Sequence, residues 1–152
     1  MTDTGSPSDT RALTQTERSA LSALMDRLVP PIDDLPGAGT MALLAEVEAM
    51  AGRHAPYRRA LLHIADALGT AAFSALDGAA QDAAISRFEK AEPMTFEAVR
   101  AMVYLAYYGN GRVHQRIGWR GGPLQPHGFP LPPFDELVLE TTRKRQPLWR
   151  QV

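Results

Sequence analysis

The feature that most constrains the fold is a repeated spacing of apolar residues by three and four positions, interrupted by glycine and proline. In the first such segment these residues are Leu21, Leu24, Met25 and Leu28. This spacing places them on one face of a helix. The preceding "TQTE" (residues 14–17) has the spacing of a capping box, which favours a helix start there. The helix is expected to end before Pro30–Gly39, because adjacent prolines lack backbone donors and disfavour helical geometry in the preceding residue.

Four further segments show the same helical pattern, at about residues 40–51, 56–68, 79–91 and 93–108. Gly52 and Gly69 suit helix ends, and Pro56 suits a first helical turn. In the last segment the expected buried face is Phe96, Val99, Val103, Ala106 and Tyr107. No segment alternates polar and apolar residues as a half-buried strand does. The sequence therefore predicts an all-α protein, a small irregular bundle of about five to six helices.

The composition changes along the chain and indicates its organisation. Residues 1–12 are polar and are expected to be disordered. Residues 13–110 form the predicted helical domain. Residues 111–152 are rich in proline, glycine and aromatic residues, and are expected to form a long loop, a short helix capped by Asp135, and a basic tail that wraps a partner.

Few residues in the sequence are candidates for catalysis, metal binding or ligand binding. With no cysteine and a formal net charge of -1, the 152-residue chain has no thiolate metal ligands and no excess of basic residues for nucleic acid. His63, in an apolar helical segment, is expected to be a structural, hydrogen-bonded histidine. His114 and His127 share the loop region, and a ligand site there, near Asp33 or Asp34, is the alternative interpretation. We predict no catalytic, cofactor-binding or metal-binding residue otherwise.

The stretch Tyr107–Phe134 has the composition of a protein–protein contact. It combines prolines, which reduce the entropy lost on ordering, with aromatic and arginine side chains, which are enriched at interfaces. Residues 98–152 carry eight basic and three acidic residues, which suggests an acidic partner. The predicted partner-binding residues are Tyr107, Tyr108, Arg116, Trp119, Arg120, Phe129, Phe134, Trp149 and Arg150. The other interpretation is that these aromatic residues cover the chain's own core.

Several ordered pieces of the sequence resemble the gluconate 2-dehydrogenase subunit 3 family. The first carries the pattern in Leu13, Thr14, Glu17, Arg18, Leu28, Val29, Pro30, Asp33, Asp34, Pro36, Gly37 and Ala38. "YRRALLHIADALG" and "FSALDGAAQDAAISRFE" are similar to the family's paired helices. Tyr108-Gly109-Asn110 and Gly118-Trp119 are similar to its late Tyr-Gly-Asn turn and "GW" pair.

This resemblance implies a non-catalytic small subunit that supports folding, stability or export of a catalytic partner. The partner is a glucose–methanol–choline (GMC) flavoprotein that holds FAD and oxidises sugars, sugar acids or other alcohols, often with a cytochrome c as electron acceptor. Unlike many members, the chain shows no twin-arginine signal. We therefore expect a cytoplasmic location, or a periplasmic one if a signal-bearing partner carries it. "GFPLPPF" departs from the family's usual ending, so the substrate is left open.

Overall fold

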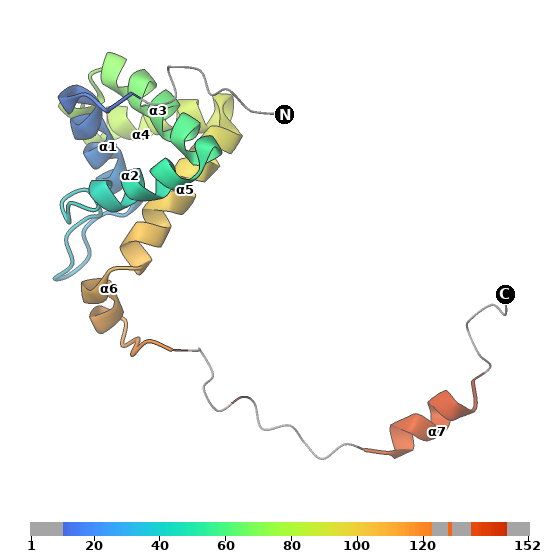
Figure 1. Ribbon diagram of the computed structural model, residues 1–152. Helices are drawn as coiled ribbons and strands as arrows, with labels where there is room; N and C mark the ends of the chain where they lie inside the picture. Colours follow the sequence, from blue (N-terminus) through green and yellow to red (C-terminus); the bar gives the residue numbers. More distant parts are fainter. Residues whose placement is uncertain (1–10, 123–127, 129–134, 146–152) are drawn as a thin grey trace, which may run out of the picture. The chain divides into compact units, whose positions relative to one another are not determined.

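The computed structural model describes residues 11–122, 128 and 135–145, which fall into two units, residues 1–120 and 121–152 (Figure 1). In its described part, the first unit contains six α-helices: α1 (Gln15–Leu28), α2 (Leu44–Arg53), α3 (Ala55–Thr70), α4 (Gly78–Ala91), α5 (Pro93–Tyr108) and α6 (Gly111–Arg116). A 3-10 helix, η2 (Phe73–Ala75), precedes α4, and the described residues form no strand. The predicted all-α bundle is confirmed. The second unit contains α7 (Leu137–Arg143), where Asp135 accepts a hydrogen bond from the Leu137 amide as expected.

Helix α3 is the centre of the bundle. It packs against α1, α2 and α5, while α4 packs against α1 and α5. The predicted apolar stripes form the core, and the largest fully buried side chains are Phe73, Leu21, Leu24, Met25, Ile64, Met102, Val47, Val99, Val103 and Val113. Helix α4 lies at the periphery, since it has no fully buried residue and contributes only partly buried ones such as Ile85 and Phe88.

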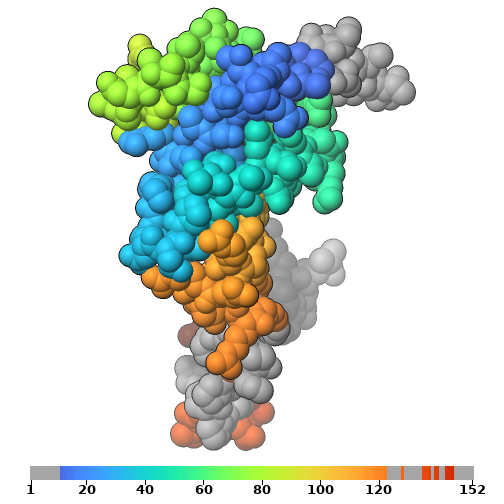
Figure 2. All heavy atoms as spheres, turned by 90° about the vertical axis from the view of Figure 1, so that its left-hand side faces the viewer, coloured from blue at the N-terminus to red at the C-terminus, as the bar shows by residue number. Residues whose placement is uncertain are grey.

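The loop between α1 and α2 folds back tightly on α1. The Asp26 carboxylate accepts hydrogen bonds of 2.9 Å from both the backbone N–H and the hydroxyl of Thr40. Gly39 packs so closely that a Cβ atom there would lie 1.9 Å from the carbonyl oxygen of Ser22. At the loop tip, Ile32 and Leu35 exchange two backbone hydrogen bonds of 3.0 and 2.9 Å. In Figure 2 the blue atoms of this loop lie directly against the orange atoms of α6.

Two boundaries differ from the prediction. Helix α2 begins at Leu44 rather than near Thr40, because Thr40 is bound to Asp26 and Ala42 takes a left-handed conformation (φ 59°). The loop expected from residue 111 instead begins with α6. Asn110, expected in a turn, caps this helix by accepting a hydrogen bond from the Arg112 amide, and Val113 is buried. The helical unit therefore extends to Arg120.

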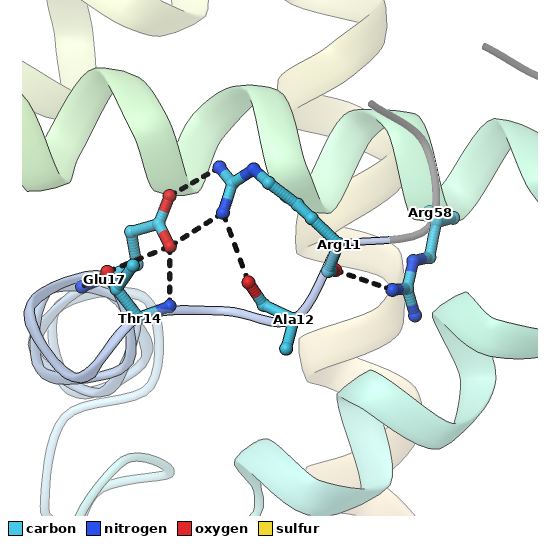
Figure 3. A network of polar contacts seen from close by, with 5 residues as sticks. All are labelled: Arg11, Ala12, Thr14, Glu17 and Arg58. Atoms are coloured by element: carbon cyan, nitrogen blue, oxygen red, sulfur yellow. Dashed lines mark hydrogen bonds and ion pairs between the residues drawn. The ribbon is translucent and has the colours of Figure 1, made fainter. Parts of the chain in front are cut away.

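A polar network closes the start of α1 (Figure 3). Thr14 and Glu17 form the predicted capping box, and Arg11 binds both carboxylate oxygens of Glu17 at 2.5 and 2.8 Å. Arg58 on α3 donates a hydrogen bond of 2.7 Å to the carbonyl oxygen of Arg11. The Glu17 side chain is buried, and the hydrogen bonds from Arg11, followed by those from Thr14, lower its pKa to about 2. The network attaches the chain from residue 11 onward to α1 and α3.

Two further findings bear on function. His63 is not the structural, hydrogen-bonded histidine that was expected: its side chain points to solvent from α3, and the nearest carboxylate oxygen, on Glu92, is 3.9 Å away. None of the helices in the described ranges combines the length and the apolar character needed to cross a lipid bilayer.

Candidate partner-binding surface

The end of α5 exposes a second apolar face. Met102, Val103, Ala106 and Tyr107 on one side of this helix pack in the core. On the other side, Tyr104 is 41% exposed, Leu105 60% and Tyr108 56%. A helix that is apolar all round is normally buried on all sides. The exposed face is therefore a surface suited to contact with another molecule.

This face lines an open groove of about 730 Å³. Its lining is mostly apolar and aromatic, from Ala101, Tyr104, Leu105 and Tyr108 on α5 and from His114 and Trp119 beyond it. Gly109 and two charged residues of α5, Glu97 and Arg100, complete the lining. The rings of Tyr104 and Tyr108 meet edge to face, with centroids 6.3 Å apart. Such packing holds the aromatic side chains in defined orientations before any partner binds.

The turn after α5 brings Trp119 to the groove. Gly109 ends the helix at a close approach, since a Cβ atom there would lie 2.8 Å from the carbonyl oxygen of Leu105. After α6, the backbone N–H of Trp119 donates a 2.9 Å hydrogen bond to the carbonyl oxygen of His114. The His114 and Trp119 rings also meet edge to face, with centroids 4.1 Å apart. Trp119 is thus placed by both its backbone and its ring.

Helix α6 is connected to the α1–α2 loop by one arginine. The Arg116 guanidinium donates from Nε to Asp34 Oδ1 at 2.9 Å and from Nη2 to Asp33 Oδ2 at 2.6 Å. These hydrogen bonds raise the pKa of Arg116 above its usual value, and the bond to Asp34 has the largest effect. The two carboxylates, which precede Arg116 by more than eighty positions, therefore hold the end of α6 against the loop.

The predicted partner-binding residues are distributed unevenly. Tyr108 and Trp119 line the groove, and Arg120, which follows Trp119 in the sequence, is exposed. Tyr107 is a core residue with 4% exposure, so its side chain is not presented to a partner. Arg116 is exposed but is engaged by Asp33 and Asp34. The remaining predictions, Phe129, Phe134, Trp149 and Arg150, lie outside the described residues.

Tyr104 and Leu105 also form this surface, although they were not among the predicted partner-binding residues. The run "YLAYY" (residues 104–108) contains more apolar residues than one buried helical stripe accommodates. Counting the apolar residues around the full circumference of the helix would have revealed the second face.

The alternative ligand site finds no support in the described residues. Asp33 and Asp34 are bound to Arg116, and the His114 ring contacts Trp119 and the carbonyl oxygen of Tyr108. His127 lies outside the described residues. Within those residues, no three His, Asp or Glu side chains come together as metal ligands.

A second groove, of about 780 Å³, lies between α3 and the start of α5. Its charged lining mixes both signs, with Arg11 and Arg59 beside Asp66 and Glu92. This mixture favours no single ligand chemistry, and the apolar groove along another face of α5 is the stronger candidate site.

Comparison with known proteins finds no matching family model, no matching curated protein and no matching solved structure. The functional interpretation therefore depends on the exposed surface and on the sequence patterns located there.

Proposed function

We propose that this chain is a non-catalytic small subunit that binds and stabilises, or helps to mature, a GMC-type FAD-dependent sugar or alcohol dehydrogenase. The observation that carries the proposal is the location of the late sequence patterns. Tyr108 and Gly109 of the Tyr-Gly-Asn turn, and Trp119 of the "GW" pair, line the apolar groove. Three of the residues that carry the resemblance to the gluconate 2-dehydrogenase subunit 3 family thus line this exposed surface.

The groove has the chemistry of an interface centre. Interfaces are enriched in tyrosine, tryptophan and arginine, and a few aromatic side chains carry most of the binding energy. Here Tyr104, Tyr108 and Trp119 line the same groove as the exposed Leu105. A partner that inserts an apolar side chain between these rings would remove all four from water and gain affinity from that burial.

The proposed division of labour assigns the chemistry to the partner. FAD and the residues that act on the substrate belong to the flavoprotein, with a cytochrome c subunit as the proposed electron acceptor. This chain supplies a surface and takes no part in the redox step. The complex is proposed to be cytoplasmic, or periplasmic if the flavoprotein carries an export signal.

The first experiment is co-purification with the host's GMC flavoproteins. We expect the tagged full-length chain to yield a yellow complex of fixed stoichiometry, containing a flavoprotein that is insoluble when expressed alone. A colourless, well-folded chain that captures none of these flavoproteins would overturn the proposal.

Variants then locate the interface. We expect Leu105→Ala and Trp119→Ala each to weaken flavoprotein binding at least about tenfold, a loss of about 1.4 kcal/mol. Met94→Ala is the matched control, because Met94 is 82% exposed at the opposite end of the same helix and outside the groove. Deletion of Leu148–Val152 tests the predicted docking tail in the same assay. Circular dichroism should show unchanged helix content throughout, and full binding by both alanine variants would contradict the assignment of this surface.

A further inference from the structure

Helix α6 is too short to be stable alone. It comprises six residues, Gly111–Arg116, whereas an isolated helix in water requires at least about 12 residues. Its orientation must therefore come from contacts with the rest of the bundle. Val113 provides one, since it is buried in the core next to α5. The two bonds from Arg116 provide a second, and the contact of His114 Nε2 with the carbonyl oxygen of Tyr108 provides a third.

The loop that receives Arg116 is itself firmly placed. Asp26 on α1 holds Thr40, and the close packing of Gly39 on Ser22 brings the loop against the helix. Asp33 takes a left-handed conformation (φ 50°) at the loop tip, which is closed by the paired backbone bonds of its neighbours. The backbone that carries the two carboxylates is thus held in place where the arginine binds.

The position of Trp119 depends on α6. The backbone of Trp119 is bonded to His114, and the two rings are in contact. His114 lies on α6 between Val113 and Arg116, and among the described residues its own polar contact with α5 is a single one, to the carbonyl oxygen of Tyr108. A rotation of α6 about its buried residue would therefore move Trp119 away from Tyr108 and open the groove.

We infer that Arg116 is a positioning residue. Its bonds to Asp33 and Asp34 hold α6, and with it Trp119, in the orientation that forms the apolar groove. All three side chains are exposed, so salt screens their attraction. The groove is accordingly best formed at low ionic strength. The effect of Arg116 on partner binding rests on the proposed function, whereas its effect on Trp119 is a property of this chain alone.

The test within the chain uses Trp119 as a reporter. The protein has two tryptophans, so a Trp149→Phe background leaves Trp119 as the only one. In the full-length chain, Arg116→Gln and the double variant Asp33→Asn/Asp34→Asn are each expected to increase acrylamide quenching and to lower the fluorescence anisotropy of Trp119. Combining all three substitutions should cause no further change in quenching or anisotropy, because each variant breaks the same contact.

Salt and a matched variant complete this test. About 1 M NaCl should raise quenching in the parent but leave Arg116→Gln unchanged, because the Debye length falls to about 3 Å. Arg112→Gln removes an exposed charge from the same helix and should leave quenching at the parent level. Unchanged Trp119 quenching in Arg116→Gln, or an equal change in Arg112→Gln, would overturn the inference. Circular dichroism verifies that each variant is folded.

Measurements of flavoprotein binding distinguish a positioning role of Arg116 from direct contact with the partner. If Arg116 acts through Trp119, Arg116→Gln weakens flavoprotein binding, and the double variant Arg116→Gln/Trp119→Ala binds no more weakly than Trp119→Ala alone. Additive losses would show that Arg116 touches the partner directly and would overturn the positioning role. If no flavoprotein binds at all, the proposed function fails while the fluorescence result still decides the role of Arg116.

Discussion

The network around Glu17 allows a quantitative prediction about acid stability. The carboxylate accepts hydrogen bonds from Arg11 and from the backbone N–H and hydroxyl of Thr14. All of these favour the ionised form, so Glu17 titrates at a lower pH in the folded chain than in the unfolded chain. One pH unit between two pKa values corresponds to about 1.4 kcal/mol. The pKa of Glu17 falls from its ordinary value of 4.5 to about 2 in the folded chain. This difference sets an upper limit of about 3 kcal/mol on what the ionised carboxylate contributes to the free energy of unfolding.

Solvent reduces this limit. The Arg11 side chain is 37% exposed, so screening weakens its interaction, and we expect a contribution of about 2 kcal/mol. Because the folded-state pKa is lowered, this stabilisation is complete above pH 4.5 and disappears as the pH falls towards about 2. Replacing Glu17 with glutamine removes the titration but keeps the size of the side chain.

The assay is urea unfolding followed by circular dichroism between about pH 7 and about pH 2. At neutral pH we expect Glu17→Gln to have a free energy of unfolding about 2 kcal/mol below that of the parent, and at the acid end we expect the two to converge. Glu46→Gln, a change at an exposed carboxylate in α2, controls for the loss of one charge. A constant difference between Glu17→Gln and the parent across this range would refute the reasoning.

Three further substitutions test the packing. Gly39→Ala is expected to lower the free energy of unfolding by about 2 kcal/mol, because its Cβ atom would lie 1.9 Å from a backbone oxygen. Gly52→Ala, which meets nothing within 4 Å inside α2, should instead stabilise by up to about 1 kcal/mol. A loss at Gly52 equal to that at Gly39 would contradict the steric argument. Phe73→Ala should cost about 3–5 kcal/mol in urea unfolding, since Phe73 is fully buried, and a loss below about 1 kcal/mol would show that the site collapses around the smaller side chain.

The parts of the fold that the sequence predicted are those set by local rules. The capping box at Thr14, the apolar stripes and the breaks at glycine and proline depend on residues a few positions apart. The predicted start of α2 near Thr40 was wrong, because Asp26, fourteen positions before Thr40, holds that residue in the loop. No local pattern contains that contact.

The candidate site was predicted only in part for the same reason. Trp119 and Tyr108 were found from composition, because aromatic residues stand out in a stretch rich in glycine and proline. Arg116 was assigned to the partner, yet its acceptors lie in a loop that only the fold brings near. Tyr107 and Tyr108 are adjacent in sequence, and their opposite environments depend on which face of α5 meets the core.

The peripheral position of α4 has a consequence for how the protein opens. Local unfolding is easiest where few apolar groups are buried, and α4 contains no fully buried residue. Its outer contacts, such as the ion pair between Arg27 and Asp82, are also exposed to solvent. Amide hydrogen exchange should therefore be faster in α4 than in α3. Arg100, which lines the groove, forms an ion pair of 3.8 Å with Glu89 on α4, so local opening of α4 would also remove a contact at the edge of the binding surface.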